Sequence, residues 1–238
     1  EVKAQFAVPS GSYEGRWFDP KFKKNPNDNA LRAERLFDEQ AAKDVVERVK
    51  GKAAVVTETS KRTTQLSPQL FDLTSLQREA NNKFGFSAKT TLAIAQALYE
   101  KHKLLTYPRT DSRALPEDYL GTVQETLCLL SGTQAYQPYA EEILQKNWVK
   151  PNRRIFDNAK ISDHFAIIPT LQTVKTGLSE AELKVYDLVV RRFMAVFYPA
   201  AQFDVTTRIS KVDGDHFKTE GKVLIEPGWM AVYGREAT

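Results

Sequence analysis

The segment KHKLLTYPRTDSR, residues 101–113, places a phenol two positions before a guanidinium. Tyr107 precedes Pro108, and a residue before proline is pushed out of the helical region, so we expect an extended loop here. Alternate side chains then share a side, which puts Tyr107, Arg109 and Asp111 together and Pro108 and Thr110 opposite. A phenolate can attack phosphorus while a guanidinium neutralises the non-bridging oxygens in a bidentate contact. The pattern therefore suits phosphoryl chemistry.

The same residues also have ordinary interpretations. A phenol with a pKa of about 10 is only about 0.1% ionised at pH 7, so a nucleophile at Tyr107 needs help, which the charge of Arg109 could provide. A tyrosine near a helix end is usually a partly buried ring, and the chain has nine tyrosines. Arg109 and Asp111 could simply form a surface pair worth about 0 to 1 kcal/mol. Asp111 or Ser112 could also be a helix N-cap.

The composition indicates a soluble globular protein with enough apolar residues to form a core. Of 238 residues, 42% are hydrophobic and 27% charged, and no window approaches 18 uninterrupted apolar residues. Cys128 is the single cysteine, which excludes an intrachain disulfide and a clustered-cysteine zinc site and fits a reducing compartment. A net charge of +4 modestly favours a polyanionic partner. The first residue is Glu and no signal peptide is visible, so we expect a segment of a longer, non-secreted protein.

The beginning of the chain is expected to be rich in strands. Residues 1–8 alternate, with Val2, Ala4, Phe6 and Val8 on one side. After a turn-rich segment at residues 23–29, a helix is expected to end at Gly51. Its apolar residues recur every three or four positions at Ala30, Ala33, Phe37, Ala41, Val45 and Val49. Residues 53–64 form a β-branched run that predicts another strand, and we place a domain boundary near residue 67.

The middle of the chain is expected to be helical. Thr74 and Gln77 stand in capping-box register for a helix that closes on Gly85, and Ser87 is a second N-cap. The second helix carries Leu92, Ala95 and Tyr99 along one face and leads into the tyrosine loop. Further helices are expected within residues 116–130 and 138–146, and this region is expected to end near residues 163–170.

The last part returns to strands after one helix. Ser179 and Glu182 form a capping box for that helix, which Pro199 should stop. Its expected buried residues are Leu183, Tyr186, Val190, Phe193 and Phe197. Residues 202–210 alternate as a strand, and Asp213-Gly214 predicts a hairpin. The sequence thus predicts an α+β fold, with a β-rich domain (residues 1–66 and 171–238) into which an all-helical domain (residues 67–170) is inserted.

The segment LLTYPRTDS, residues 104–112, resembles the active-site signature of type IA DNA topoisomerases, and the proline after the tyrosine resembles the topoisomerase III branch. Residues 74–100 are similar to the helical pair that precedes this tyrosine, and KISDHFAIIPT, residues 160–170, resembles the later histidine motif. VYDLVVRRFMAVFYP (185–199) and TEGKVLIEPGW (219–229) also match. The resemblance covers most of residues 67–238 in the family's order.

The resemblance implies roles for individual residues. Tyr107 would be the nucleophile that takes a DNA 5′-phosphate and frees a 3′-hydroxyl. Arg109 would hold the scissile phosphate, and His164 would hydrogen-bond the DNA backbone near the break. The supporting residues would be Thr106, Asp111, Gln96 and Glu100.

Several of these residues also have simple alternatives. Gln96 and Glu100 lie four positions apart and so share a helix face, which could be merely solvated. His164 could be a neutral imidazole that donates to Asp163 or to the backbone. Weaker candidates for phosphate contacts, all of which could be ordinary surface cations, are Arg113, Lys160, Arg191 and Arg192. His102 and His216 have no motif around them and receive no role.

The resemblance also implies an overall function. The chain would be the β-rich, gate-forming arch and the tyrosine domain of an ATP-independent enzyme that cuts and reseals single-stranded DNA and passes a strand through the break, relaxing or decatenating DNA. No P-loop pattern is present. The family's upstream acidic domain, which binds Mg²⁺, has no counterpart, so this fragment would hold no metal and be nearly inactive alone. We expect a cytoplasmic monomer without a membrane contact, associated with the nucleoid if bacterial.

Two other hypotheses stay open at this point. A non-catalytic module could bind single-stranded nucleic acid through its basic loop and stack Tyr107 on a base. Replacement of Tyr107 by phenylalanine would then have little effect, because a phenylalanine ring also stacks. A tyrosine recombinase would need more Arg, Lys and His positions around the tyrosine than Arg109 and His164 supply.

Overall fold

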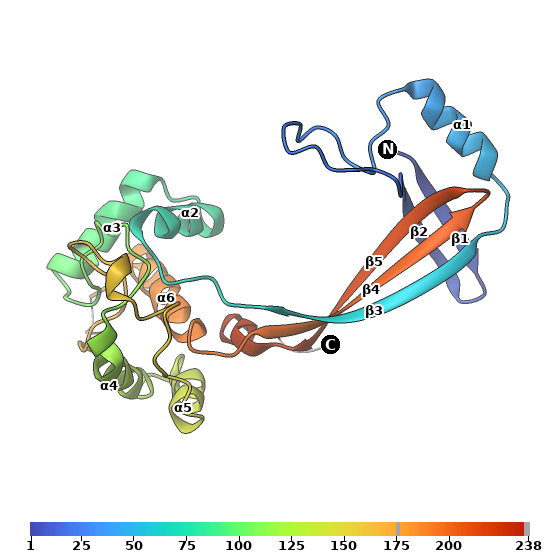
Figure 1. Ribbon diagram of the computed structural model, residues 1–238. Helices are drawn as coiled ribbons and strands as arrows, with labels where there is room; N and C mark the ends of the chain where they lie inside the picture. The colour runs from blue at the N-terminus through green and yellow to red at the C-terminus, as the bar shows by residue number, and fades with distance from the viewer. Residues whose placement is uncertain (175–176, 236–238) are drawn as a thin grey trace. The chain divides into compact units, whose positions relative to one another are not determined.

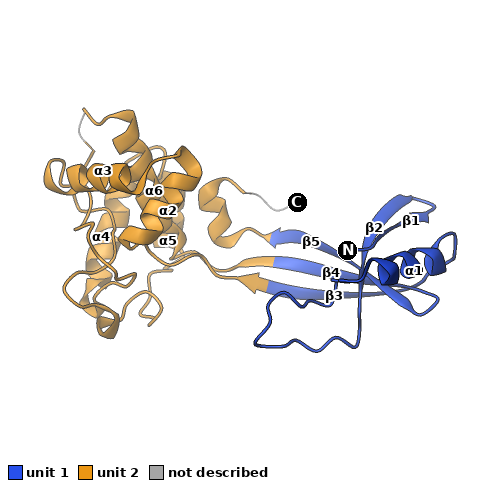
Figure 2. Cartoon of the chain, turned by 90° about the horizontal axis from the view of Figure 1, so that it is seen from above, with its two compact units in different colours: residues 1–63, 203–225, 238 blue, residues 64–202, 226–237 orange. Residues whose placement is uncertain are grey.

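The computed structural model describes residues 1–174 and 177–235, and these residues form two compact units. The first unit contains residues 1–63 and 203–225, and the second contains residues 64–202 and the segment that begins at residue 226. Figure 2 shows the first unit in blue and the second in orange. Both units are therefore built from segments that are far apart in the sequence.

Within the described residues, a five-stranded sheet of order β1-β2-β5-β4-β3 forms most of the first unit (Figure 1). The strands are β1 (Lys3–Val8), β2 (Gly11–Phe18), β3 (Val55–Gln65), β4 (Ala201–Val212) and β5 (Asp215–Glu226). β2 pairs antiparallel with both β1 and β5. Asp213 and Gly214, which join β4 to β5, have φ angles of 47° and 89°. A tight hairpin turn needs such positive angles, so the predicted hairpin is confirmed.

Helix α1 (Glu39–Val49) packs its apolar face on this sheet. Val45 forms a small core with Val2, Val212 and Phe217. The expected start near residue 30 is wrong, because residues 30–38 contain no helix and the side chain of Phe37 is 70% exposed. Asp38 caps the helix by accepting a hydrogen bond from Gln40 N.

Strand β2 was not anticipated from the sequence. Gly15 interrupts its pattern because a Cβ atom at this position would lie 2.9 Å from Cε2 of Phe6 and 3.0 Å from Cβ of Phe217. The Phe6 ring therefore crosses the strand at Gly15 and packs edge-on against Phe217 at 5.6 Å between centroids. A glycine inside a strand marks this kind of close approach.

The second unit is built of helices and loops. Its α-helices are α2 (Leu73–Phe84), α3 (Ala88–Glu100), α4 (Leu120–Leu130), α5 (Gln137–Gln145) and α6 (Glu180–Ala195). Three short 3₁₀ helices in its described part are η1 (Glu117–Tyr119), η2 (Asn158–Lys160) and η3 (Gly228–Tyr233). The helices expected around residues 74–85, 87–102, 116–130 and 138–146 are thus all present.

Caps define where these helices begin. Ser87 and the Ser179–Glu182 capping box are confirmed at the starts of α3 and α6. The expected cap at Thr74 is wrong: Asp72 caps α2, and its carboxylate accepts a hydrogen bond from Ser75 N at 2.7 Å. Asp72 replaces Thr74 because Ser75 completes a capping box with it by bonding back to the Asp72 backbone. The C-terminal Gly85 adopts φ of 70°, as predicted for a residue that ends a helix.

Helix α6 lies in the core of the second unit. Val185, Val189 and Phe193 are completely buried, and α6 contacts α2, α3 and α5. Leu183, expected in the core, is 47% exposed because it lies on the outer side of the first turn. The segment 171–202, which the sequence analysis placed in the β-rich domain, therefore belongs to the second unit where it is described, and the first crossing lies at residues 63 and 64 rather than at 67.

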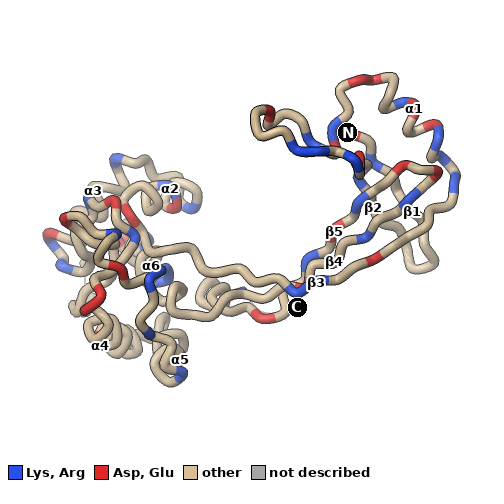
Figure 3. The backbone as a smooth tube through the Cα atoms, viewed as in Figure 1, with Lys and Arg blue, Asp and Glu red and all other residues tan. Residues whose placement is uncertain are grey.

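Charge is distributed over both units. Figure 3 shows Lys and Arg as well as Asp and Glu along the backbone tube of each unit. Within the described residues, none of the helices is long and apolar enough to cross a membrane.

Candidate active site

The tyrosine loop, residues 103–115, has one buried side and one outward side. Pro108, Thr110 and Ser112 are buried, whereas Arg109 and Asp111 are exposed. Tyr107 is partly exposed. The alternation expected from an extended backbone is therefore present, with Tyr107, Arg109 and Asp111 on the outward positions.

Small hydroxyl side chains fasten the buried side of this loop to residues 160–168. Thr106 Oγ1 donates to the carbonyl of Ala166 at 2.9 Å and accepts from the N–H of Ile168 at 2.9 Å. Thr110 Oγ1 donates to the carbonyl of His164 at 3.2 Å, and Ser112 Oγ donates to that of Lys160 at 2.8 Å. These contacts join the backbone of the tyrosine loop to the backbone of the histidine motif, so the two segments hold each other in register.

The ring of Tyr107 lies against two other rings. Its centroid is 4.2 Å from that of His164, with 40° between the planes, and 5.3 Å from that of Tyr99 in an edge-on contact. Tyr99 comes from α3, so a helix, the loop and the histidine motif all contribute to the cluster. The structure thus brings Tyr107 and His164, 57 positions apart in the sequence, into direct contact.

The polar groups on the outward side have no competing partners. Within the described residues, the side chains of Tyr107, Arg109, Asp111 and His164 make no hydrogen bond or ion pair with the protein. The alternative surface pair of Arg109 with Asp111, and that of the His164 imidazole with Asp163, are therefore not formed. A guanidinium that lacks a carboxylate partner keeps its donors available for the oxygens of a phosphate.

Two of the supporting residues contact each other on α3. Gln96 Nε2 donates to Glu100 Oε1 at 2.6 Å, as their spacing allows. Oε1 of Gln96 is buried and has no partner within the described residues. A buried acceptor without a donor is costly, so an amide in this position favours a ligand or water that donates to it. The support of Tyr107 by these two residues stays a prediction.

The four weaker cationic candidates have partners in the chain. Arg113 Nε donates to Asp72 at 2.8 Å, and Lys160 Nζ lies 3.0 Å from Asp157. Arg191 contacts Asp187 at 2.9 Å. Arg192 is only 8% exposed and donates to the carbonyl of Gln69. All four cations thus have partners within the protein, and their phosphate contacts stay a prediction.

The pair of Arg113 with Asp72 connects the loop to α2. Burial of Asp72 raises the pKa of its carboxyl, but hydrogen bonds from Ser75 and Arg113 together outweigh burial and lower that pKa. The loop is also held by a hydrogen bond from Leu73 N to the Thr110 carbonyl at 3.0 Å. The first turn of α2 therefore helps to position the tyrosine loop.

Three contributors to the site were not found from the sequence. Tyr99 was placed on a helix face without a role, and Thr110 and Ser112 were not recognised as anchors. The sequence does contain a signal for the inward position of Thr110 and Ser112, because these small hydroxyl residues alternate with the charged residues at 109, 111 and 113. His102 also has a partner, since its Nε2 lies 3.2 Å from Glu182 in the capping box of α6.

A metal site is not supported by the described residues. They contain no group of three or more His, Cys, Asp and Glu side chains that could hold a metal ion. Asp111 is the carboxylate on the outward side of the tyrosine loop, and one carboxylate does not make a magnesium site. The family resemblance implies a Mg²⁺ held outside this chain, and that stays a prediction.

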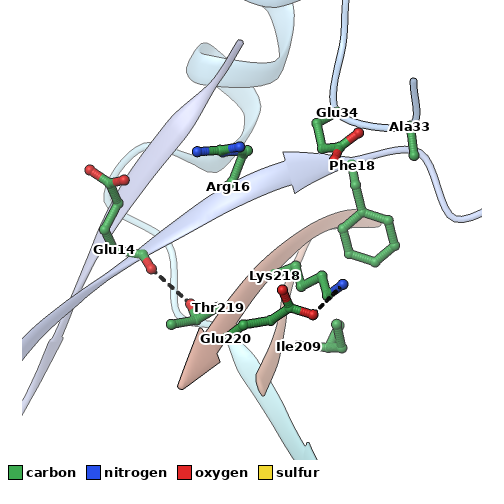
Figure 4. A pocket seen from close by; sticks show the side chains of 9 residues that line it. All are labelled: Glu14, Arg16, Phe18, Ala33, Glu34, Ile209, Lys218, Thr219 and Glu220. Carbon is green, nitrogen blue, oxygen red and sulfur yellow. Dashed lines mark hydrogen bonds and ion pairs between the residues drawn. The ribbon is translucent and has the colours of Figure 1, made fainter. Parts of the chain in front are cut away.

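A cavity of about 550 Å³ lies in the first unit and shares no residue with the tyrosine cluster (Figure 4). Charges of both signs line it. Lys218 Nζ lies 2.6 Å from Glu220 Oε1, and Thr219 donates to the carbonyl of Glu14. Glu14 and Arg16 pair with Lys3 and Glu1, which lie outside the lining. The described lining residues contain no group of the kind that Tyr107 and Arg109 form, so the tyrosine cluster remains the better candidate for chemistry.

Comparison with known proteins identifies the family. The sequence model described as DNA topoisomerase matches residues 2–238. This chain belongs to the DNA topoisomerase family. The chain is 46% identical over 201 residues to DNA topoisomerase 3 of Bacillus cereus, a match that covers 84% of this chain and 27% of that protein. It is 42% identical over 221 residues to DNA topoisomerase 3 of Bacillus subtilis, covering 91% and 29% respectively.

Both relatives are named DNA topoisomerase 3, which confirms the resemblance of this chain to the topoisomerase III branch. The chain spans between a quarter and a third of the length of the curated relatives, at 27% and 29%. Full-length topoisomerase I of Thermotoga maritima has a similar fold, with a TM-score of 0.58 at 20% identity over 99% of this chain and 37% of that one. The mixed helix and sheet architecture is therefore that of a topoisomerase.

Proposed function

We propose that this chain is the tyrosine-bearing part of a type IA topoisomerase that cuts and reseals single-stranded DNA. Residues 64–202, where described, would be the inserted helical domain, and the sheet unit would be the arch that lets a second strand pass. The observation that carries the proposal is the contact of Tyr107 with His164, beside an Arg109 that has no ion-pair partner among the described residues.

The proposed reaction is a reversible transesterification. Tyr107 Oη attacks the phosphorus, a bond forms between them, and the bond from phosphorus to the 3′ oxygen breaks. The phenolic proton passes through solvent to the departing 3′ oxygen, which leaves as a hydroxyl, and the 5′-phosphate stays on the tyrosine. Resealing reverses these steps, so the energy of the phosphodiester is kept and no nucleotide is consumed.

The residues around Tyr107 have distinct parts in this proposal. Arg109 neutralises the non-bridging oxygens, where negative charge grows as the phosphorus is attacked. His164 donates to a phosphate oxygen of the bound strand while its ring restrains the tyrosine. Thr106 fixes the loop through two backbone contacts. Asp111, Gln96 and Glu100 would be polar residues that orient the strand.

The rest of the proposal concerns the whole protein. The Mg²⁺ implied by the resemblance would be held by residues outside this chain, which alone would cleave DNA poorly. The whole enzyme would act as a monomer in the cytoplasm, at the nucleoid, and would prefer single strands because unpaired bases can stack on aromatic side chains.

A trapped-adduct assay tests the proposal. The chain is placed in the complete enzyme, incubated with labelled single-stranded DNA and denatured, and covalent protein–DNA species are counted. Tyr107→Phe keeps the ring contacts and removes the nucleophile, so we expect no adduct. Tyr99→Phe, a neighbouring phenol in the same cluster, is the matched control and should still form one.

The outcomes separate the proposal from the binding-module alternative. If Tyr107→Phe still yields an adduct, the assignment of the nucleophile is wrong. If neither the wild-type protein nor Tyr99→Phe forms an adduct but both bind single strands as well as Tyr107→Phe does, the chain is a binding module rather than part of an enzyme.

A further inference from the structure

A second cavity, of about 430 Å³, lies in the helical unit away from the tyrosine cluster. Its walls come from Gln65 and Pro68, the second half of α2, Arg192 of α6, and η3 with Arg235. Its volume is within the range of about 300 to 1,000 Å³ typical of small-molecule pockets. None of its lining residues belongs to the tyrosine loop or the histidine motif.

Arg192 is the buried polar group of this cavity. The residue is 8% exposed, its Cζ lies 4.0 Å from the centroid of Phe71, and its Nη1 donates to the Gln69 carbonyl at 2.9 Å. Nε of Arg192 is buried and has no hydrogen-bond partner within the described residues. A charged donor left in this way is costly unless an acceptor enters the site. An anion in the cavity would satisfy it.

Two further cations border the cavity. Lys83 lies 5.2 Å above the ring of Tyr233, and Arg235 is exposed. The one acid in the lining, Glu79, lies 3.6 Å from Lys83 and 3.8 Å from Arg192. Three cations against one carboxylate leave an excess of positive charge, which favours an anionic ligand such as a phosphate group.

The aromatic wall adds a second kind of contact. Nε1 of Trp229 donates to the carbonyl of Gln65 at 2.9 Å, and the Trp229 ring contacts that of Tyr233 edge-on at 5.9 Å. The indole is therefore fixed in orientation and only partly buried. A fixed aromatic face beside cations suits a planar base that carries a phosphate.

We propose that this cavity binds one nucleotide unit, with its phosphate at Arg192, Lys83 and Arg235 and its base against Trp229. The unit would belong to a DNA strand, a choice that rests on the proposed function, whereas a free nucleotide would offer the same chemistry. Helix α2 separates the two sites: its first turn holds the tyrosine loop and its last turn carries Lys83. The 12 residues of α2 span about 18 Å. The cavity therefore lies apart from the tyrosine loop and would be a second place where the strand contacts the protein.

Binding measurements on the 238-residue chain test this inference. A fluorescein-labelled thymidine hexanucleotide is titrated by anisotropy, and thymidine 5′-monophosphate and inorganic phosphate are titrated by calorimetry. The test variant is Lys83→Ala with Arg235→Ala, because both side chains are on the outside of the fold. Lys146→Ala is the matched control, since Lys146 also sits over an aromatic ring, at 5.0 Å, beside a glutamate four positions away.

We expect the double variant to bind the hexanucleotide about tenfold more weakly, because two charge-assisted contacts are lost. The control should change by less than about twofold, as for an exposed lysine outside the site. The slope of log K against log salt should become shallower by about 1.4 in the double variant, which a merely structural effect would not produce. Circular dichroism checks that all variants keep their helices.

The ligands distinguish the two sources. Loss of affinity for the hexanucleotide alone assigns the site to a strand, and equal loss for thymidine 5′-monophosphate assigns it to a free nucleotide; both support a nucleotide site. Unchanged hexanucleotide and monophosphate affinity in the double variant, or inorganic phosphate binding as tightly as the monophosphate, overturns it. Adduct formation by Tyr107 in the complete enzyme is independent of this result, so either proposal can fail alone.

Discussion

Replacement of Thr106 by valine tests whether the hydroxyl contacts hold the tyrosine loop. Valine has nearly the same shape but lacks Oγ1, which donates to the Ala166 carbonyl and accepts from the Ile168 N–H, both at 2.9 Å. Ala166 and Ile168 are 0% and 1% exposed. The variant therefore leaves two buried backbone groups without a partner.

The expected cost follows from those two groups. A buried polar group without a hydrogen bond costs about 1 to 3 kcal/mol, and the added methyl group offsets part of this. We expect Thr106→Val to lower the free energy of unfolding of the helical unit by about 2 to 4 kcal/mol. Urea unfolding, followed by the fluorescence of Trp148, which lies in this unit, measures the change.

Thr126→Val is the matched control for this experiment. Thr126 is 1% exposed and its Oγ1 donates to the Thr122 carbonyl, which as part of α4 also accepts a backbone N–H. Its removal leaves no group unsatisfied and should cost less than about 1 kcal/mol. Equal losses in the two variants, or no loss in Thr106→Val, would refute the assignment of the hydroxyl contacts as the fastening of the loop.

Three further outcomes are expected. Gly228→Ala should destabilise the helical unit by more than about 3 kcal/mol, because its Cβ would lie 2.5 Å from the Pro199 carbonyl oxygen, whereas Gly234→Ala, also at positive φ but in open space, should cost about 1 to 2 kcal/mol in the same urea assay. Since the pKa of the Asp72 carboxyl is lowered from 3.8, its contribution to stability should be complete above pH 3.8 and be lost as the pH falls below that value. Asp72→Asn should remove this part of the acid dependence of the melting temperature. An unchanged dependence would contradict the contact with Arg113. Ser179→Ala should lower the free energy of unfolding by about 1 kcal/mol in thermal melts, because the N-cap of α6 is lost. Ser162→Ala is the control and should lack this effect, because Ser162 is exposed and caps none of the described helices.

Local signals in the sequence were sufficient for much of the fold. Helices α2 to α6 follow from apolar spacing and from caps such as Ser87, since these patterns are decided by neighbours within a few residues. The Asp213-Gly214 turn was equally local, because only a few residue types accept two consecutive positive φ angles.

What the sequence missed depends on contacts between distant segments. The sequence pattern of strand β2 is interrupted at Gly15, and the side chains of Phe6 and Phe217 from the two neighbouring strands explain this glycine. The regular spacing of Ala30, Ala33 and Phe37 resembles a helix, but Asp19 N bonds to the Ala33 carbonyl and holds that stretch as a loop. In both places a tertiary contact overrode the local pattern.

The candidate site divides in the same way. The outward positions of Tyr107, Arg109 and Asp111 follow from the extended backbone before a proline. The resemblance implied a DNA-backbone contact for His164 but no contact with Tyr107, and no spacing rule predicts a meeting of residues 57 positions apart. The alternation of hydroxyl and charged residues could have placed Thr110 and Ser112 on the inward side, but their partners are known only from the position of residues 160–168 in the structure.

The hydroxyl contacts beneath Tyr107 have one more consequence. The side chains of the loop bind it to the histidine motif. The tyrosine and the imidazole are therefore held side by side without a bound substrate. Under the proposed function, an incoming strand would lose conformational entropy on its own side only, since the protein side is already ordered. A bond cut on such a prearranged surface would then be rejoined at the same place.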